Sequence, residues 1–170
     1  MNIFIMRHGQ AAPKVSTDAL RPLTDQGKSE VCLMAQWLAA QVSKFDYVLV
    51  SPYLRASQTW QQVSQYISAT VVENCPELTP DADADIAASV LLAYGDLAPE
   101  CHVLVISHMP MVGLLVESLC PAIMAPIFVT SGVAKVSFGQ GGAGVFDWLE
   151  GPHNIQNHYP PRVPELKTLR

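Results

Sequence analysis

The stretch His102-Val103-Leu104-Val105-Ile106 is the strongest strand signal in the sequence. After its first residue it is β-branched or aliphatic at every position, so both faces of the strand are apolar. A strand of this kind belongs in the middle of a parallel sheet that helices cover on both sides. Pro110 then begins a segment with helical spacing of apolar residues up to Leu119, so the chain places a helix directly after this strand.

In the sequence before this strand, strand-like and helix-like segments alternate. Thr24 is a predicted N-cap, Ser51 is another with Pro52 at the first helical position, and Gly95 is a predicted C-cap. The other predicted strands of this part are 2–6, 47–50 and 70–73, and the other predicted helices are 25–42, 52–67 and 85–94. This alternation indicates an α/β fold with three layers, α/β/α, around a mostly parallel central sheet.

The C-terminal part of the chain has a different pattern. Residues 133–138 and 145–148 are strand-like and flank the glycine-rich stretch 139–144, which predicts a hairpin at one edge of the sheet. From residue 151 the chain is polar and rich in proline. We therefore expect one domain over residues 1–150 and a surface-hugging or partly disordered tail over 151–170.

Composition excludes several classes of protein. Of 170 residues, 49% are hydrophobic and 15% charged, which is unlike a disordered chain. Ten Lys and Arg against fifteen Asp and Glu give a net charge of −5 without a basic run, so neither nucleic acid nor an anionic membrane is an expected partner. The apolar runs are too short for a membrane span or a signal peptide, which predicts a cytoplasmic protein. The scattered cysteines, expected to be reduced, are Cys32, Cys75, Cys101 and Cys120.

Polar residues follow three of the predicted strands at the point where each strand ends. These segments are Arg7-His8-Gly9, Ser51-Pro52-Tyr53-Leu54-Arg55 and Ser107-His108. In an open parallel sheet, ligands bind beyond the carboxyl ends of the strands. We therefore expect two arginines and two histidines to meet at one rim of the sheet.

These residue types suit a phosphoryl group. Arginine offers a planar set of donors that matches phosphate oxygens, and it stays charged at any relevant pH. A neutral histidine is a competent nucleophile when one ring nitrogen is held as a donor, because the other then presents its lone pair. Gly9, without a side chain, allows close backbone approach behind such a nucleophile.

In these motifs the sequence resembles the histidine phosphatase superfamily, and within it the short SixA-type phosphohistidine phosphatases. The resemblance extends from the N-terminus to about residue 120. The matching features are Ile3-Phe4-Ile5-Met6-Arg7-His8-Gly9, Arg21-Pro22-Leu23-Thr24 with Gly27, Val50-Ser51-Pro52 with Leu54-Arg55-Ala56 and Gln58-Thr59, Pro76-Glu77-Leu78-Thr79-Pro80, and Val103 to His108 with Pro110, Val112 and Gly113.

The resemblance implies a role for each matching residue. His8 would attack phosphorus and become a phosphohistidine that water hydrolyses, while Arg7, Arg55 and His108 would bind the nonbridging oxygens. Arg21 is a further candidate for the same pocket, with a loop arginine at the rim as the alternative.

The general acid is the undecided part of this site. Glu77 stands roughly where many members of the superfamily have a carboxylate, but the glycine-rich context usual in mutases and small-ester phosphatases is missing. An imidazole leaving group needs less protonation than an alkoxide, so this difference favours a phosphohistidine substrate. The resemblance implies that the partner is a histidine-containing phosphotransfer domain of a bacterial phosphorelay, and the small chain leaves little material for a lid over the site.

Two alternatives remain open from the sequence. One is a small-molecule phosphomonoester phosphatase or mutase of the same superfamily, which would need an acid such as Glu77. The other is a phosphoprotein-binding module without turnover, although such a module has no need of His8. No metal and no cofactor are expected: Asp81, Asp83 and Asp85 lack the glycine and glutamate of a calcium loop, and no nucleotide-binding glycine motif follows a strand.

Overall fold

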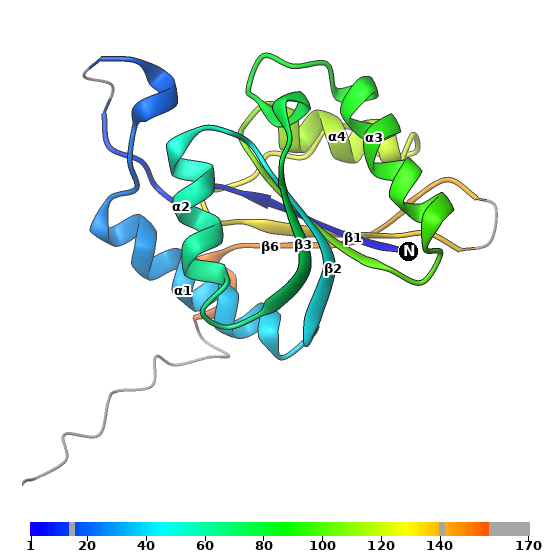
Figure 1. Cartoon of the computed structure of the whole chain (residues 1–170), viewed down its shortest axis with the longest axis horizontal. Helices are drawn as coiled ribbons and strands as arrows, with labels where there is room; N and C mark the ends of the chain where they lie inside the picture. Colours follow the sequence, from blue (N-terminus) through cyan, green and yellow to red (C-terminus); the bar gives the residue numbers. More distant parts are fainter. Residues whose placement is uncertain (14–15, 140–141, 157–170) are drawn as a thin grey trace, which may run out of the picture.

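The computed structural model describes residues 1–13, 16–139 and 142–156, which fold around one six-stranded sheet (Figure 1). The strand order is β3-β2-β4-β1-β5-β6. The first four strands in this order are parallel, β5 pairs antiparallel with β1, and β6 pairs antiparallel with β5. The strands are β1 (Asn2–Arg7), β2 (Lys44–Val50), β3 (Ser68–Asn74), β4 (His102–Ser107), β5 (Val133–Ser137) and β6 (Val145–Glu150).

Helices cover both faces of this sheet, which gives the predicted three layers. Helices α1 and α2 lie on one face, and α3 and α4 lie on the other (Figure 1). The helices are α1 (Asp25–Ala39), α2 (Leu54–Val63), α3 (Ala84–Leu97), α4 (Met111–Leu119) and the short α5 (Pro152–Ile155), with single 3-10 turns η1 (Asp18–Leu20) and η2 (Pro76–Leu78). The predictions of a mostly parallel sheet and of an edge hairpin, formed by β5 and β6, are confirmed.

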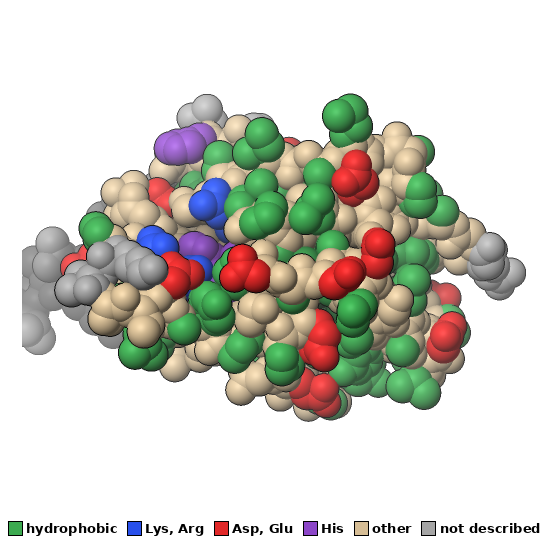
Figure 2. Space-filling model, turned by 90° about the horizontal axis from the view of Figure 1, so that it is seen from above, with side chains coloured by type: hydrophobic (Ala, Val, Ile, Leu, Met, Phe, Trp, Pro, Cys, Tyr) green, Lys and Arg blue, Asp and Glu red, His purple; other side chains and the backbone are tan. Residues whose placement is uncertain are grey.

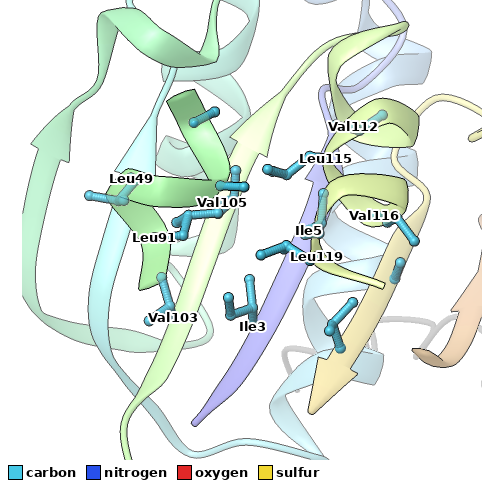
Figure 3. Packing of buried hydrophobic residues seen from close by; sticks show 14 of the residues in the cluster. Ile3, Ile5, Leu49, Leu91, Val103, Val105, Val112, Leu115, Val116 and Leu119 are labelled. Atoms are coloured by element: carbon cyan, nitrogen blue, oxygen red, sulfur yellow. The ribbon is translucent and has the colours of Figure 1, made fainter. Parts of the chain in front are cut away.

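The alternation of side chains along the central strands builds two separate cores. In β4, Val103 and Val105 pack toward α3 and α4, while Leu104 and Ile106 pack toward α1 and α2. Figure 3 shows the first core, where Leu91 from α3 and Leu115 from α4 lie over the strands. Because all six residues of β4 except His102 are buried, this strand is fixed from both sides, as its sequence predicts.

The connections between strands reverse direction between β1 and β4. The chain leaves β1 toward β2 and β3, returns to β4, and then leaves β4 toward β5 on the other side of β1. Crevices at such a reversal, beyond the carboxyl ends of the strands, are where open α/β sheets bind ligands. The two strands on either side of the reversal end in Arg7 and Ser107, so His8 and His108 follow directly.

Two predicted helix caps are wrong, and α1 and α2 end at Ala39 and Val63, before the predicted residues 42 and 67. Ser51 caps no helix, because α2 begins at Leu54 with Tyr53 at the N-cap position. Gly95 is not a C-cap, because α3 continues to Leu97. Gly95 instead faces the N-terminal residue: a Cβ at this position would lie 2.8 Å from Met1 Cε. Tertiary packing therefore explains the glycine, and helix termination does not.

The first residues of the predicted C-terminal tail form α5. Ile155 of this helix is buried, and α5 packs against α1, while His153 is exposed. The rest of the tail, including His158, lies outside the described residues. In the part of the chain that the structure describes, no helix is both long and apolar enough to span a bilayer.

Candidate functional site at the carboxyl ends of the central strands

The structure brings together the three polar segments that follow β1, β2 and β4. Two backbone hydrogen bonds tie these strand ends to one another. The N–H of His8 donates to Ser107 O at 3.0 Å, and the N–H of Ser51 donates to Ile106 O, also at 3.0 Å. The side chains of His8, Arg55 and His108 are 7%, 3% and 1% exposed, so they form a buried floor rather than a solvated surface.

His8 has its two ring nitrogens in different environments. Nδ1 lies 2.7 Å from the carbonyl oxygen of Gly9, a contact that requires a proton on Nδ1. Nε2 accepts a hydrogen bond from Nε of Arg55 at 3.1 Å, which requires a lone pair on Nε2. Burial lowers the pKa of His8 to about 4; the Gly9 carbonyl acts in the opposite direction, and the charges of Arg55 and Arg7 lower the pKa further. His8 is therefore neutral at pH 7 and presents the lone pair of Nε2.

Gly9 lies behind His8 in a place where no side chain fits. A Cβ on Gly9 would lie 2.7 Å from Val31 Cγ2 and 2.9 Å from the carbonyl oxygen of Gly27 in α1. The N–H of Gly9 donates to Oγ1 of Thr59 at 3.1 Å, and this hydroxyl donates to the carbonyl oxygen of Arg55 at 2.7 Å. Thr59 thus links the backbone next to His8 to the start of α2, where Arg55 lies.

All three guanidinium nitrogens of Arg55 donate hydrogen bonds. In addition to the Nε contact with His8, Nη1 donates to the backbone oxygen of Asp18 at 2.7 Å, and Nη2 contacts the Asp18 carboxylate at 2.9 Å. The guanidinium carbon lies 5.0 Å from the centre of the Tyr53 ring, within cation–π range. These contacts fix the direction of the Arg55 side chain at the floor of the site.

Arg21 reaches the rim of the same site through Asp18. Its Nη1 contacts the other carboxylate oxygen of Asp18 at 2.9 Å, and its Nε donates to the carbonyl oxygen of Ala12 at 2.7 Å. Asp18 therefore bridges Arg21 and Arg55. The hydrogen bond from Arg21, followed by the one from Arg55, lowers the pKa of Asp18, so its carboxylate is ionised at neutral pH.

Arg7 contacts the loop before β5. Its Nη1 donates to the carbonyl oxygen of Phe128 at 2.6 Å. The same loop holds Ser131, whose N–H donates to His8 O at 3.1 Å and whose φ of 62° makes it the one non-glycine residue with positive φ among the described residues. Left-handed backbone at a serine costs energy and is concentrated near functional sites. Here it shapes the turn that holds the backbone of His8.

Three buried side-chain atoms in the described part of the chain have no hydrogen-bond partner. They are Arg7 Nε, His108 Nδ1 and Ser131 Oγ. Two belong to the predicted site, and the third belongs to the residue that binds the backbone of His8. Buried polar atoms rarely lack partners, so Arg7 Nε and His108 Nδ1 are suited to bind oxygen atoms of a ligand.

His108 packs against two other rings. Its ring centre lies 5.0 Å from that of His8 and 5.0 Å from that of Tyr53. Its Nε2 lies 2.7 Å from Oγ of Ser51. Burial, with the nearby His8 and Arg55, lowers the pKa of His108 to about 3, so this ring is also neutral at pH 7.

Glu77 lies apart from these contacts. It is in η2, which is fixed to the end of β4 by a hydrogen bond of 2.7 Å from Ser107 Oγ to Leu78 O. Its carboxylate accepts from the thiol of Cys75 at 3.3 Å, and burial, with Glu77 itself, raises the pKa of that thiol to about 12. No hydrogen bond or ion pair joins Glu77 to His8, Arg7, Arg55 or His108 among the described contacts.

Sequence reasoning missed Asp18 and Ser131, and it did not predict the contact of Ser51 with His108 or that of Thr59 with Gly9. The spacing of Asp18 and Arg21, three residues apart, offered a signal for one contact, and Ser51 and Thr59 lie in segments that the sequence singled out. The other contacts depend on segments that are distant in sequence.

Side chains of different chemical types lie close together on the face of the molecule seen in Figure 2. Figure 2 shows histidine and basic side chains in one group, with acidic and hydrophobic side chains beside it. The described residues contain no group of three or more His, Cys, Asp or Glu side chains arranged to hold a metal ion.

Comparisons with known proteins agree with this geometry. Residues 3–79 match the model of the histidine phosphatase superfamily, branch 1. The chain is 43% identical over 157 residues to the phosphohistidine phosphatase SixA of Escherichia coli K12, which covers 92% of this chain and 97% of that protein. It is 38% identical over 128 residues to a SixA homolog of Haemophilus influenzae, covering 70% and 77% of the two chains.

A solved structure is similar over the same extent. The protein histidine phosphatase SixA complexed with tungstate superposes with a TM-score of 0.86 at 44% identity, covering 91% of this chain and 99% of that one. Sequence and structure thus agree over nearly the whole chain. This protein belongs to the histidine phosphatase superfamily.

Proposed function

We propose that the chain is a phosphohistidine phosphatase, a hydrolase that removes the phosphoryl group from a phosphorylated histidine of another protein through a covalent intermediate on His8. One observation carries this proposal: His8 commits Nδ1 to Gly9 and presents its Nε2 lone pair beside Arg55. The similarity to SixA proteins supports the substrate, and the tungstate complex of a relative supports an oxyanion site.

The reaction has two displacement steps. In the first, the hydrogen bond from Arg55 Nε to His8 Nε2 is released, the Nε2 lone pair attacks phosphorus, and the P–N bond of the substrate breaks. The substrate imidazole takes up a proton from solvent and leaves in its neutral form. In the second, water attacks phosphorus, the bond to His8 Nε2 breaks, inorganic phosphate leaves, and His8 returns to its neutral form. The low pKa of His8 keeps the attacking nitrogen unprotonated at neutral pH.

Arg7, Arg55 and His108 stabilise the charge on the transferring group. Arg7 Nε and His108 Nδ1 are buried without partners among the described residues, so each can donate to a phosphoryl oxygen without giving up a contact. Arg55 is already directed at His8 Nε2, the atom that becomes bonded to phosphorus. Donors fixed in advance around developing charge are an effective means of catalysis in phosphoryl transfer. Arg21 acts indirectly, through Asp18.

Glu77 has no part in the proposed mechanism. The leaving imidazole of a phosphohistidine departs with less help than an alkoxide, and Glu77 is hydrogen-bonded to Cys75 instead of a site residue. The competing reading, hydrolysis of small phosphate esters, requires an acid. It therefore predicts a large loss of rate when Glu77 becomes glutamine.

The partner that fits this site is a folded protein, and we propose a histidine-containing phosphotransfer domain. Leu20, next to the Asp18–Arg21 bridge, is 64% exposed, and Ile127, next to the Arg7 contact at Phe128, is 82% exposed. Large exposed apolar side chains beside a polar site are typical of protein-binding surfaces. Four free cysteines suit a reducing compartment, so we place this reaction in the cytoplasm.

Trapping of the intermediate tests the proposal directly. The protein is mixed with a ³²P-labelled phosphohistidine peptide, quenched with alkaline detergent because P–N bonds break in acid, and mapped for labelled peptides while phosphate release is followed. We expect label on the peptide that contains His8, together with phosphate release. The matched control is His153→Ala, since this histidine is exposed and no described contact joins it to His8, Arg55 or His108.

The other outcomes separate the alternatives. His8→Ala is expected to lose both label and turnover, and turnover at the parent rate in this variant overturns the covalent mechanism. Rapid hydrolysis of small phosphate esters that depends on Glu77 favours the small-molecule phosphatase. Tight binding of the phosphopeptide with neither label nor phosphate release favours a binding module.

A further inference from the structure

Ser51 is a buried residue of the site that has no place in the proposed reaction. It follows β2 directly, it is 0% exposed, and its N–H donates to Ile106 in β4. Its hydroxyl caps no helix and instead lies 2.7 Å from Nε2 of His108. This side-chain contact links the end of β2 to the end of β4. A backbone hydrogen bond, from Ser51 N–H to Ile106 O, already joins the same two strand ends.

The direction of this hydrogen bond follows from counting donors and acceptors. A serine hydroxyl has one proton and two lone pairs. The N–H of Tyr53 points to Oγ of Ser51 at a long 3.5 Å and takes one lone pair. If His108 Nε2 donated as well, the Ser51 proton would be buried without an acceptor among the described residues. If Ser51 donates to Nε2, the hydroxyl proton has an acceptor and the hydroxyl oxygen still accepts from Tyr53.

The direction of the hydrogen bond between Ser51 and His108 also decides whether His108 Nδ1 carries a proton. With Nε2 accepting from Ser51, the single proton of the neutral His108 ring is on Nδ1. Nδ1 is buried and has no partner among the described residues, so it becomes a donor without an acceptor. The opposite tautomer would place a bare lone pair there, which would repel an oxyanion. The rings of His8 and Tyr53, each with its centre 5.0 Å from that of His108, pack against the ring and restrict its rotation.

We propose that Ser51 is a positioning residue that donates to Nε2 of His108 and so holds His108 as the Nδ1–H tautomer, ready to donate to an oxygen of the transferring group. The low pKa of His108 agrees with a neutral ring in the free protein. The identity of that oxygen rests on the proposed function. The tautomer itself is a property of the free protein, so its test does not depend on activity.

The test is ¹⁵N–¹H correlation NMR of the histidine side chains near pH 7 in the full chain. The His108 signals are assigned by their loss in His108→Asn. In the parent protein we expect a protonated Nδ1 and an unprotonated, hydrogen-bonded Nε2. A protonated Nε2 in the parent overturns the proposal without the need for any Ser51 variant.

Two variants then test the role of the hydroxyl. Ser51→Ala is expected to shift His108 toward the Nε2–H tautomer and to lower kcat on a phosphohistidine peptide by about tenfold to hundredfold, the range found for residues that orient a functional histidine. Ser51→Thr keeps the hydroxyl and is expected to restore both the tautomer and most of kcat. An unchanged tautomer in folded Ser51→Ala overturns the proposal. A changed tautomer with unchanged kcat overturns its catalytic part.

A failure of the proposed function gives a different pattern. In that case the parent releases no phosphate from phosphohistidine, but the NMR signals of His108 still answer the question of its tautomer. If Ser51→Ala does not fold, Ser51→Cys, with a weaker donor of similar size, is expected to show a partial tautomer shift.

Discussion

The floor of the site and its rim are built by different parts of the molecule and in different ways. The floor consists of His8, Arg55 and His108, which are at most 7% exposed and are held by the ends of three neighbouring strands and by the first turn of α2. The rim includes η1, which has no buried residue, and its Asp18 side chain is 38% exposed. Buried, hydrogen-bonded groups are fixed in one geometry, whereas exposed ion pairs contribute little to stability.

This difference suggests a division of labour. Groups that must face developing charge within a fraction of an ångström belong on the floor, because closely packed strands hold them there. Groups that only adjust the charge around the opening can lie on a surface turn. The same substitution should therefore lower kcat much more at a floor residue than at a rim residue.

The largest contrast is expected between two arginines. Arg55→Lys removes the planar donor set that contacts both His8 and Asp18, and we expect it to lower kcat about a hundredfold or more. Arg21→Lys keeps a charge at the rim and is expected to change kcat less than about fivefold. Steady-state kinetics with one phosphohistidine peptide measures both. Equal losses in the two variants would remove the distinction between floor and rim.

The buried histidines should also make stability depend on pH. The pKa is about 4 for His8 and about 3 for His108 in the folded chain, below the ordinary value near 6.5, so the unfolded chain binds protons more readily. Stability is thus fully present above about pH 6.5 and decreases as the pH falls, until the folded-state pKa values are reached. Between pH 7 and pH 5 each histidine is expected to cost about 2 kcal/mol.

Urea unfolding at a series of pH values measures how steeply the free energy of unfolding changes with pH. His108→Gln should reduce the slope, while the exposed-histidine variant His153→Ala should leave it unchanged. A parent protein whose stability is flat between pH 7 and pH 5 would contradict the neutral, buried state of both rings.

A smaller effect is expected at Asp18. Its ionised carboxylate occupies Nη2 of Arg55, where it competes with an anionic ligand. Asp18→Asn removes this negative charge, and inorganic phosphate should then inhibit a few-fold more tightly, an effect that salt weakens. Asp25→Asn is the matched control, because Asp25 is an exposed aspartate at the start of α1. Weaker inhibition by phosphate in Asp18→Asn would show that Asp18 acts mainly by orienting Arg55.

The smallest effect is expected at Glu77. Because its carboxylate is hydrogen-bonded to Cys75 and not to the floor, Glu77→Gln should change the hydrolysis of a phosphohistidine peptide less than about twofold. The same variant is assayed on a small phosphate ester. A loss of a hundredfold on the peptide would make Glu77 a general acid and would extend the floor to η2.

Much of the fold was predictable because its signals are local. The apolar run of β4, the strand before Arg7 and the helical spacing of α1 each reflect a periodicity that burial on the sheet requires. The two wrong cap predictions, at Ser51 and Gly95, have the same cause. Ser51 and Gly95 have the residue types of caps, but the first binds His108 and the second makes room for Met1. Partners distant in sequence overruled local preference at both positions.

By itself, the sequence determined the alternation of strands and helices and the placement of Arg7, His8, Arg55 and His108 at strand ends, because backbone periodicity and the rules of parallel sheets depend on neighbouring residues. Only the tertiary structure decided which nitrogen of His8 faces Arg55, that Asp18 bridges two arginines, and that Ser51 meets His108. These contacts join residues 30 or more positions apart, apart from that of Asp18 with Arg21. Hydrogen-bond direction and burial arise only when distant segments pack together, so local patterns cannot encode them.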